Sequence, residues 1–143
     1  MNIGIAGTHQ FNNYRLFYKI VEKIIKKTYS RNINLIVMDN LIKDNNFIGI
    51  SYMATTFANK KQYKFELIPI NFYDFSHPLS QKKEKNGKFI NKNAGMIQQK
   101  LFLEKCDFFI LFHRNEISFQ YLIKNANKES ITFFEFKLNN KNK

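Results

Sequence analysis

The sequence of 143 residues predicts an α/β fold, with a parallel β-sheet of about five strands flanked by helices. Short apolar runs, continuous or nearly so, are typical of strands that are buried on both faces of a parallel sheet. Five such runs occur, at 3–6, 33–38, 65–70, 108–112 and 131–136. Segments with apolar residues three and four positions apart lie between them, at 14–28, 48–62, 94–105 and 117–128. This repeated alternation indicates right-handed crossovers between parallel strands, and hence a Rossmann-like sheet.

Each element has its own local signal. The first run, IGIA, leads directly into Gly7, and the segment 14–28 carries stripes that include Leu16, Ile20 and Ile24. The helical pattern is weakest over 48–62. The last two helices carry stripes made of Ile97, Leu101, Phe102, Phe119, Leu122, Ile123 and Ala126. Pro69 is expected at the end of the third strand, because proline cannot donate a hydrogen bond to a neighbouring strand.

The polar segment SHPLSQKKEKNGKFINKN, residues 76–93, is predicted to be a loop. It is long for a connection between a strand and a helix, and loops of this length are usually functional or mobile. The chain length fits one domain, which we place at 1–138, followed by a disordered tail at 139–143.

The net charge of +12, from 23 Lys and Arg against 11 Asp and Glu, indicates anionic partners such as nucleic acid or nucleotides. A low-GC genome explains the charge equally well, because lysine, asparagine and isoleucine all have AT-rich codons. Arginine, the preferred residue for bidentate phosphate recognition, is limited to Arg15, Arg31 and Arg114.

Several classes of protein are disfavoured. The single cysteine, Cys106, excludes an internal disulfide and fits a reducing cytoplasm. No secretory leader is recognisable, and the longest apolar run, 108–112, is too short to span a bilayer. His9, His77 and His113 lack metal-ligand spacing, so neither a metal nor a cofactor is predicted. No Ser-His-Asp set or carboxylate pair is recognisable, which favours a protein that is not an enzyme.

Candidate ligand-binding residues follow the predicted strands, because the carboxyl ends of parallel strands line one crevice. Gly7, Thr8 and His9 follow the first strand, and the segment 39–51 follows the second. The basic loop follows the third strand, and the segment 113–118 follows the fourth. A structural turn and helix cap is the alternative role for Gly7 and Thr8, and a polar rim position is the alternative for His9.

The segment NKNAGM, residues 91–96, begins the helix before the fourth long strand. Its small residues Asn93, Ala94 and Gly95 would leave backbone N–H groups open to an anion, with Lys88 and Lys92 nearby. The sequence therefore predicts a phosphate site here, with an ordinary helix cap as the alternative.

Two motifs resemble the SLOG superfamily, in particular its small stand-alone members of the YspA- and YpsA-related, DUF2493-like type. GTHQFNNY, residues 7–14, follows their pattern G-[ST]-R-x-F-x-[DN]-Y, with His9 in place of arginine. NAGMIQQKLFLEKCDFFILF, residues 93–112, follows their second motif. The matching positions are Gly7, Thr8, Phe11, Asn13, Tyr14, Asn93, Ala94, Gly95, Ile97, Leu101 and Asp107.

The chain departs from that family in its glycine-rich segments. Residues 45–51 keep Gly49 but have Asn46 and Ser51 where the family has glycine and aspartate. Ser118-Phe119 stands in place of a glycine-threonine pair. The motif P-G-G-x-G-T-x-x-E of the related phosphoribohydrolases is absent, which argues against cleavage of that kind.

The resemblance implies non-catalytic binding of a nucleotide-derived small molecule, for sensing or sequestration. An ADP-ribose-type or cyclic nucleotide immune signal would fit, and so would a phage-encoded anti-defence role. It also implies a homo-oligomer. The lysines of the 82–92 loop would assist, and the expected contact residues are Gly7, Thr8, His9, Phe11, Tyr14, Gly49, Ser51, Lys92, Asn93, Ala94, Gly95, Gln98, His113, Arg114 and Ser118.

Two other functions stay open. A nucleotide-processing enzyme, such as an N-glycosidic hydrolase, would need a carboxylate in the crevice, and Asp39, Asp44 and Glu116 are the candidates. A nucleic-acid binding domain is the second alternative, because the charge is high and a SLOG-type domain also occurs in the DNA-processing protein DprA.

Overall fold

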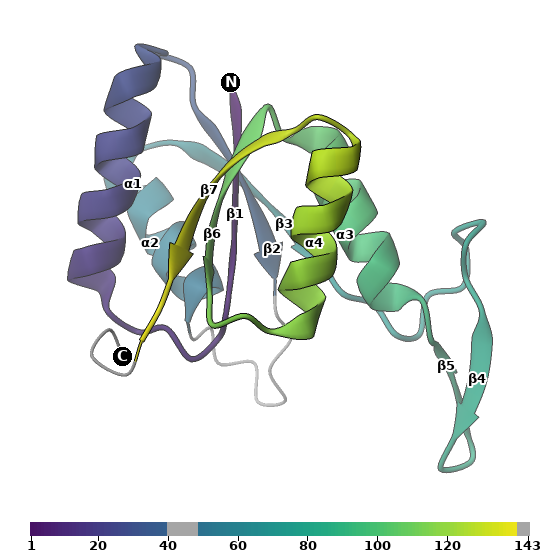
Figure 1. Cartoon of the computed structure of the whole chain (residues 1–143). Coiled ribbons are helices and arrows are strands. Elements are labelled where there is room, and N and C mark those ends of the chain that lie inside the picture. The colour runs from purple at the N-terminus through teal and green to yellow at the C-terminus, as the bar shows by residue number, and fades with distance from the viewer. Residues whose placement is uncertain (40–48, 140–143) are drawn as a thin grey trace.

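The computed structural model describes residues 1–39 and 49–139, and it confirms the predicted α/β fold (Figure 1). A parallel sheet of five strands has the order β3-β2-β1-β6-β7. Its strands are β1 (Asn2–Gly7), β2 (Asn34–Asp39), β3 (Lys64–Pro69), β6 (Phe108–His113) and β7 (Thr132–Lys137). The helices are α1 (Tyr14–Thr28), α2 (Ile50–Lys61), α3 (Ala94–Lys105) and α4 (Ile117–Lys128).

The helices form one layer on each face of the sheet. α1 and α2 lie on one side, and α3 and α4 lie on the other (Figure 1). Alternate residues of each central strand contribute to two separate apolar clusters. Ile3 and Ile5 pack with Phe17 and Phe57 on the α1–α2 side, while Ala6 lies in the cluster of α3 and α4. The spacing of two residues along a strand explains this division.

The central strands β1, β2 and β6 are buried on both faces, as their apolar runs predict. The same expectation is wrong for the third and fifth strands. β3 and β7 form the edges of the sheet, and most of their residues are exposed or only partly buried. Pro69 is the last residue of β3, which is the position expected for it.

The expectation of a plain loop over 76–93 is also wrong. β4 (Lys82–Lys85) and β5 (Lys88–Asn91) pair as an antiparallel hairpin that projects from the body of the molecule (Figure 1). Asn86 and Gly87 join them with φ angles of 53° and 77°. Asn-Gly is the preferred pair for such a turn, because both central residues need positive φ. This dipeptide was the signal in the sequence that could have predicted the hairpin.

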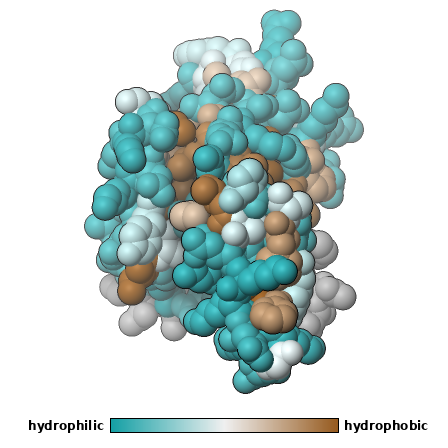
Figure 2. Space-filling model, turned by 90° about the vertical axis from the view of Figure 1, so that its right-hand side faces the viewer, coloured by the Kyte–Doolittle hydropathy of each residue, from teal (hydrophilic) through white to brown (hydrophobic). Residues whose placement is uncertain are grey.

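Asn91 holds the base of this hairpin. Its side chain is 1% exposed. The amide nitrogen donates to the carbonyl of Asp74 at 2.9 Å and to the hydroxyl of Ser80, and the amide oxygen accepts from the backbone N–H groups of Gln81 and Asn93. A buried amide with all these partners fixes the position of the hairpin relative to the start of α3. On this side of the molecule, hydrophilic residues surround a set of apolar residues across the middle of the face (Figure 2).

No helix within the described residues is long and apolar enough to cross a membrane. The predicted tail is described only at Asn139, and its remaining residues, 140–143, lie outside the described part of the chain.

Candidate ligand-binding site at the carboxyl edge of the sheet

A small hollow lies at the carboxyl edge of the sheet, between the end of β1 and the start of α4. Its volume is about 260 Å³, and it is lined by Thr8, His9, Gln10, Glu116, Ser118 and Phe119. β1 and β6 are neighbours in the sheet, but α1 and α4, which follow them, lie on opposite faces. This point, where the winding of the sheet reverses, is where open α/β sheets usually bind ligands.

Thr8 shapes the first wall of the hollow. Its backbone N–H donates to the carbonyl of Phe112 at 2.9 Å, which extends the sheet by one bond beyond β1. Its carbonyl accepts from the N–H of Phe11, and its hydroxyl accepts from the N–H of Gln10 at 3.3 Å. These bonds turn the chain sharply after the strand, so that the buried Thr8 and the exposed His9 face the start of α4.

Glu116 forms the opposite wall and has the most informative chemistry in the site. It is the N-cap of α4, yet its side chain makes no capping hydrogen bond. Oε1 accepts from the backbone N–H of Arg114 at 2.8 Å. Oε2 is buried and has no hydrogen-bond partner among the described residues. A buried acceptor without a donor costs free energy, on the order of 1–3 kcal/mol, so this oxygen is suited to a donor supplied by a ligand.

Arg114 connects the two walls. Its guanidinium donates to the side-chain oxygen of Gln10 at 3.3 Å, while its Nε is buried and has no partner within the described part of the chain. The expected contact at Arg114 therefore lies beside the hollow, although Arg114 does not line it. Gln10 lines the hollow and was not among the residues expected from the sequence.

His113 does not reach the hollow, contrary to the expectation from its place after a strand. Its side chain is 1% exposed. Nε2 lies 2.6 Å from a carboxylate oxygen of Glu135 on β7, and Nδ1 accepts from the backbone N–H of Asn115 at 3.0 Å. Because both ring nitrogens have partners in the protein, we assign His113 a structural role that ties β6 to β7.

Gly7 and Gly49 are needed for close packing. A Cβ on Gly7 would lie 2.5 Å from the carbonyl oxygen of Phe112 and 2.7 Å from Ile50. A Cβ on Gly49 would lie 2.5 Å from the backbone oxygen of His9, and Gly49 also has a φ of 67°. The space beside each glycine is therefore occupied by protein, where a ligand phosphate was expected.

Two other expected contact residues, Phe11 and Ser51, are buried in the core, and a third, Tyr14, is partly buried and packs against it. Phe11 is completely buried, with its ring centroid 5.2 Å from that of Phe112. Ser51 is 3% exposed and donates to the carbonyl of Met38. Tyr14 packs against Phe17, and burial raises the pKa of its phenol. None of these three residues lines the hollow.

The start of α3 lies at the same edge of the sheet, beyond the ends of β2 and β3. Gln98 donates to the carbonyls of Asp39 at 2.7 Å and Ile68 at 2.9 Å, so its amide nitrogen fastens α3 to the sheet. Gln99 donates to the carbonyl of Ser118, which joins α3 to the first turn of α4. The two predicted regions are thus linked along one edge.

The predicted phosphate site at the start of α3 is altered in two respects. Asn93 is the N-cap of α3, but its side chain makes no capping hydrogen bond, and its amide nitrogen donates instead to the carbonyl of Leu79 at 2.8 Å. A cavity of about 140 Å³ beside Ala94 also contains Asp74, whose pKa is lowered by hydrogen bonds from Ser76. A phosphate is disfavoured beside this charge.

The first turn of α3 is more open at Gly95. A Cβ there would meet only Ile70, at 3.6 Å, so neither packing nor backbone conformation requires glycine at this position. Lys92 is exposed just before the helix. Lys88, by contrast, lies at the far end of the hairpin, three residues from Asn91, or about 10 Å of strand. The expectation that Lys88 lies near the start of α3 is therefore wrong.

Of the carboxylates considered for catalysis, Glu116 lines the hollow and Asp39 ends β2. Asp44 and Asn46 lie outside the described residues.

Cys106 is partly buried, and burial raises the pKa of its thiol to about 12. Within the described residues, no group of three metal-binding side chains could hold an ion.

A comparison of the chain with models of known protein families finds no match, and a search of curated proteins finds no significant relative. The proposals below therefore rest on the geometry of the carboxyl edge and on the chemistry of its side chains.

Proposed function

We propose that this protein binds a nucleotide-derived small molecule at the carboxyl edge of its sheet, for sensing or sequestration and without cleaving it. The observation that carries the proposal is the buried, unpartnered Oε2 of Glu116, a residue that lines a hollow where the winding of the sheet reverses. An ionised carboxylate only accepts hydrogen bonds. It therefore suits the hydroxyl groups of a ribose or the amino group of a base better than a phosphate.

The rest of such a ligand fits the surrounding edge. Thr8, Gln10 and Ser118 supply further polar groups in the hollow. A phosphate would lie outside it, over Gly95 and near Lys92, where the first N–H groups of α3 have no intrahelical partner. The bond from Gln99 to Ser118 links the two regions. A homo-oligomer, and the phage anti-defence setting that the SLOG resemblance implies, form part of this proposal.

The first experiment is a thermal-shift screen against ADP-ribose, cyclic ADP-ribose isomers, cyclic di- and trinucleotides, AMP and NAD. A ligand at 100 times its dissociation constant stabilises the folded state by about 2.7 kcal/mol. Glu116→Gln should lower the affinity for any ligand that the screen identifies by about tenfold or more, because a charge-assisted hydrogen bond is lost. Glu129→Gln, an exposed glutamate at the other end of α4, is the matched control and should leave affinity unchanged.

Chromatography of the ligand released after denaturation separates binding from catalysis. Intact ligand supports the proposal. Recovery of base and ribose phosphate would overturn it in favour of an N-glycosidic enzyme, with Glu116 as the carboxylate nearest the substrate. If no nucleotide raises the melting temperature, the proposal fails.

The hairpin favours a second candidate function, binding of single-stranded nucleic acid. Lys82, Lys83, Lys85 and Lys88 lie on it, and Phe89 is 59% exposed. Lysines beside an exposed ring are typical of surfaces that follow a phosphate backbone and stack bases. Fluorescence anisotropy with labelled oligonucleotides would test this function. If all four lysines contact phosphates of a single strand, a plot of log binding constant against log salt concentration should have a slope of about −2.8. Phe89→Ala should weaken binding.

A further inference from the structure

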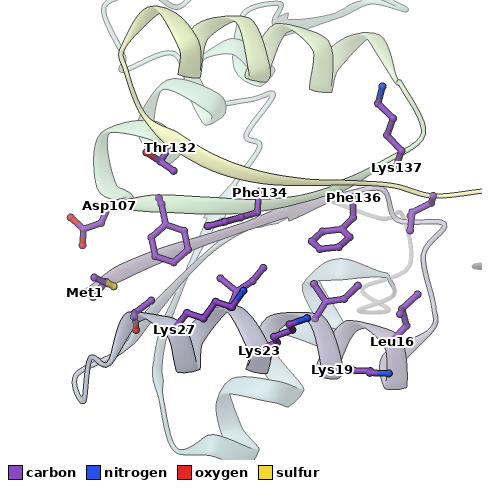
Figure 3. Close-up of a pocket in the computed structure, with 15 residues that line it drawn as sticks. Met1, Leu16, Lys19, Lys23, Lys27, Asp107, Thr132, Phe134, Phe136 and Lys137 are labelled. Atoms are coloured by element: carbon purple, nitrogen blue, oxygen red, sulfur yellow. The ribbon is translucent and has the colours of Figure 1, made fainter.

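An open apolar groove runs between α1 and the sheet, on the face opposite α3 and α4 (Figure 3). Its volume is about 850 Å³. Ile20 and Ile24 form the α1 wall, while Phe108, Phe134 and Phe136 come from β6 and β7. Phe134 is 43% exposed. The groove does not share a lining residue with the hollow at the carboxyl edge.

The groove has a regular positive border. Lys19, Lys23 and Lys27 follow one another at intervals of four residues along α1 (Figure 3). Lys137 is the last residue of β7, and its side chain points away from the groove (Figure 3). Four helical residues correspond to a rise of about 6 Å, so the three α1 charges form a nearly straight row. None of these four lysines has a carboxylate within ion-pair distance among the described residues.

The pattern of this border indicates the shape of what it would bind. A helix laid along the groove and carrying glutamates at i, i+4 and i+8 would present charges with the same spacing as the lysines. Its apolar stripe would lie on the phenylalanine rings, as helices usually cover the faces of such sheets. A second copy of this chain is disfavoured, because it would bring another row of lysines and a charge of +12 to the contact.

We propose that the groove between α1 and β7 is a docking site for an acidic amphipathic helix of a partner protein. Helix-in-groove recognition of this kind uses apolar anchors at i, i+3, i+4 and i+7, with the flanking charges selecting the partner. The proposal is independent of the nucleotide site, since the two sites have no residue in common.

The probe is a fluorescein-labelled helical peptide of about 18 residues, with a leucine stripe and glutamates at i, i+4 and i+8 along one edge. The control peptide keeps the leucines and replaces these glutamates with lysines. Anisotropy titrations of the full chain should show binding of the acidic peptide and at least tenfold weaker binding of the basic one. Affinity should fall as salt is raised from 50 to 500 mM, because exposed charges are screened.

Two variants test the site on the protein. The double substitution Lys19→Glu and Lys23→Glu should lower the affinity for the acidic peptide at least tenfold and raise the affinity for the basic peptide. Phe134→Ser should also weaken the acidic peptide, and because this ring is already half exposed the fold should persist, as circular dichroism would verify. Lys128→Glu, at the end of α4, is the matched control.

Several outcomes would overturn the proposal. One is no binding of the acidic peptide at 1 mM protein, and another is equal weakening by Lys128→Glu and the double substitution. Light scattering that shows a dimer broken by Phe134→Ser would assign the groove to a second copy. Sedimentation with vesicles of phosphatidylglycerol, abolished by the double substitution while the peptide fails to bind, would assign it to a lipid surface.

Discussion

The substitution Gly7→Ala tests whether the glycine after β1 serves packing or a ligand. The added Cβ would lie 2.5 Å from the carbonyl oxygen of Phe112 and 2.7 Å from Ile50. Relief to an ordinary contact of 3.4 Å requires a movement of roughly 1 Å, and the nearest atom belongs to the backbone of the central strand β6. Overpacking in a core costs about 1–3 kcal/mol, and we expect the upper half of that range because backbone yields less readily than a side chain.

The assay is urea unfolding followed by circular dichroism, with melting temperatures measured in parallel. A loss of about 2–3 kcal/mol corresponds to a fall of roughly 4–12 °C for a chain of this size. Gly95→Ala is the matched control, since its Cβ would meet only Ile70, at 3.6 Å, and should leave the free energy of unfolding unchanged or raise it by up to about 1 kcal/mol. If Gly7→Ala is as stable as the wild type, the packing explanation is refuted, and a role for this glycine in ligand binding is favoured instead.

Three further predictions concern stability and reactivity. The ion pair with Lys61, at 2.5 Å, lowers the pKa of Glu22 from 4.5 to about 2, so its contribution is complete above pH 4.5 and disappears as pH falls towards 2. The melting temperature of Glu22→Gln should therefore lie below that of the wild type at pH 6 and coincide with it near pH 2. A difference in melting temperature that persists at pH 2 would contradict this role of the ion pair. Glu129→Gln is the control. Burial raises the pKa of Cys106 from 9.0 to about 12, so iodoacetamide should alkylate the folded protein roughly a thousandfold more slowly than the urea-unfolded chain, and equal rates would show an exposed thiolate. Gln98→Leu leaves two strand-end carbonyls without their donor and should lower the free energy of unfolding by about 2 kcal/mol in urea titrations; a change below about 0.5 kcal/mol would mean that water replaces the amide.

Much of the fold could be predicted because local patterns determine it. The stripes of Leu16, Ile20 and Ile24 and the small residues before α3 locate two helices to the residue, since helix periodicity and helix starts are local properties. The hairpin was missed although its Asn-Gly turn is also local, because half of its strand residues are lysine and the strands show no apolar alternation.

The candidate site could be predicted only in part. Thr8, His9 and Ser118 line one hollow, because every parallel strand ends at the same edge, and their contact with a ligand stays a prediction. His113 was expected there for the same reason, and Phe11 because of the SLOG resemblance, but both residues are buried. Gln10 was missed altogether, and Glu116 was considered only for catalysis, because nothing in the sequence shows that Oε2 of Glu116 is buried without a partner.

The sequence by itself determined the succession of the four helices and the five sheet strands along the chain, their approximate ends and the character of the core, because hydrophobic spacing acts over short stretches of chain. Only the tertiary structure decided which strands lie at the edges of the sheet and that the imidazole of His113 hydrogen-bonds to Glu135. It alone also placed the lysine row of α1 beside the phenylalanines of β7. These features depend on contacts between residues far apart in the chain, and the physical reason is that burial and pairing are properties of the packed molecule and not of any one segment.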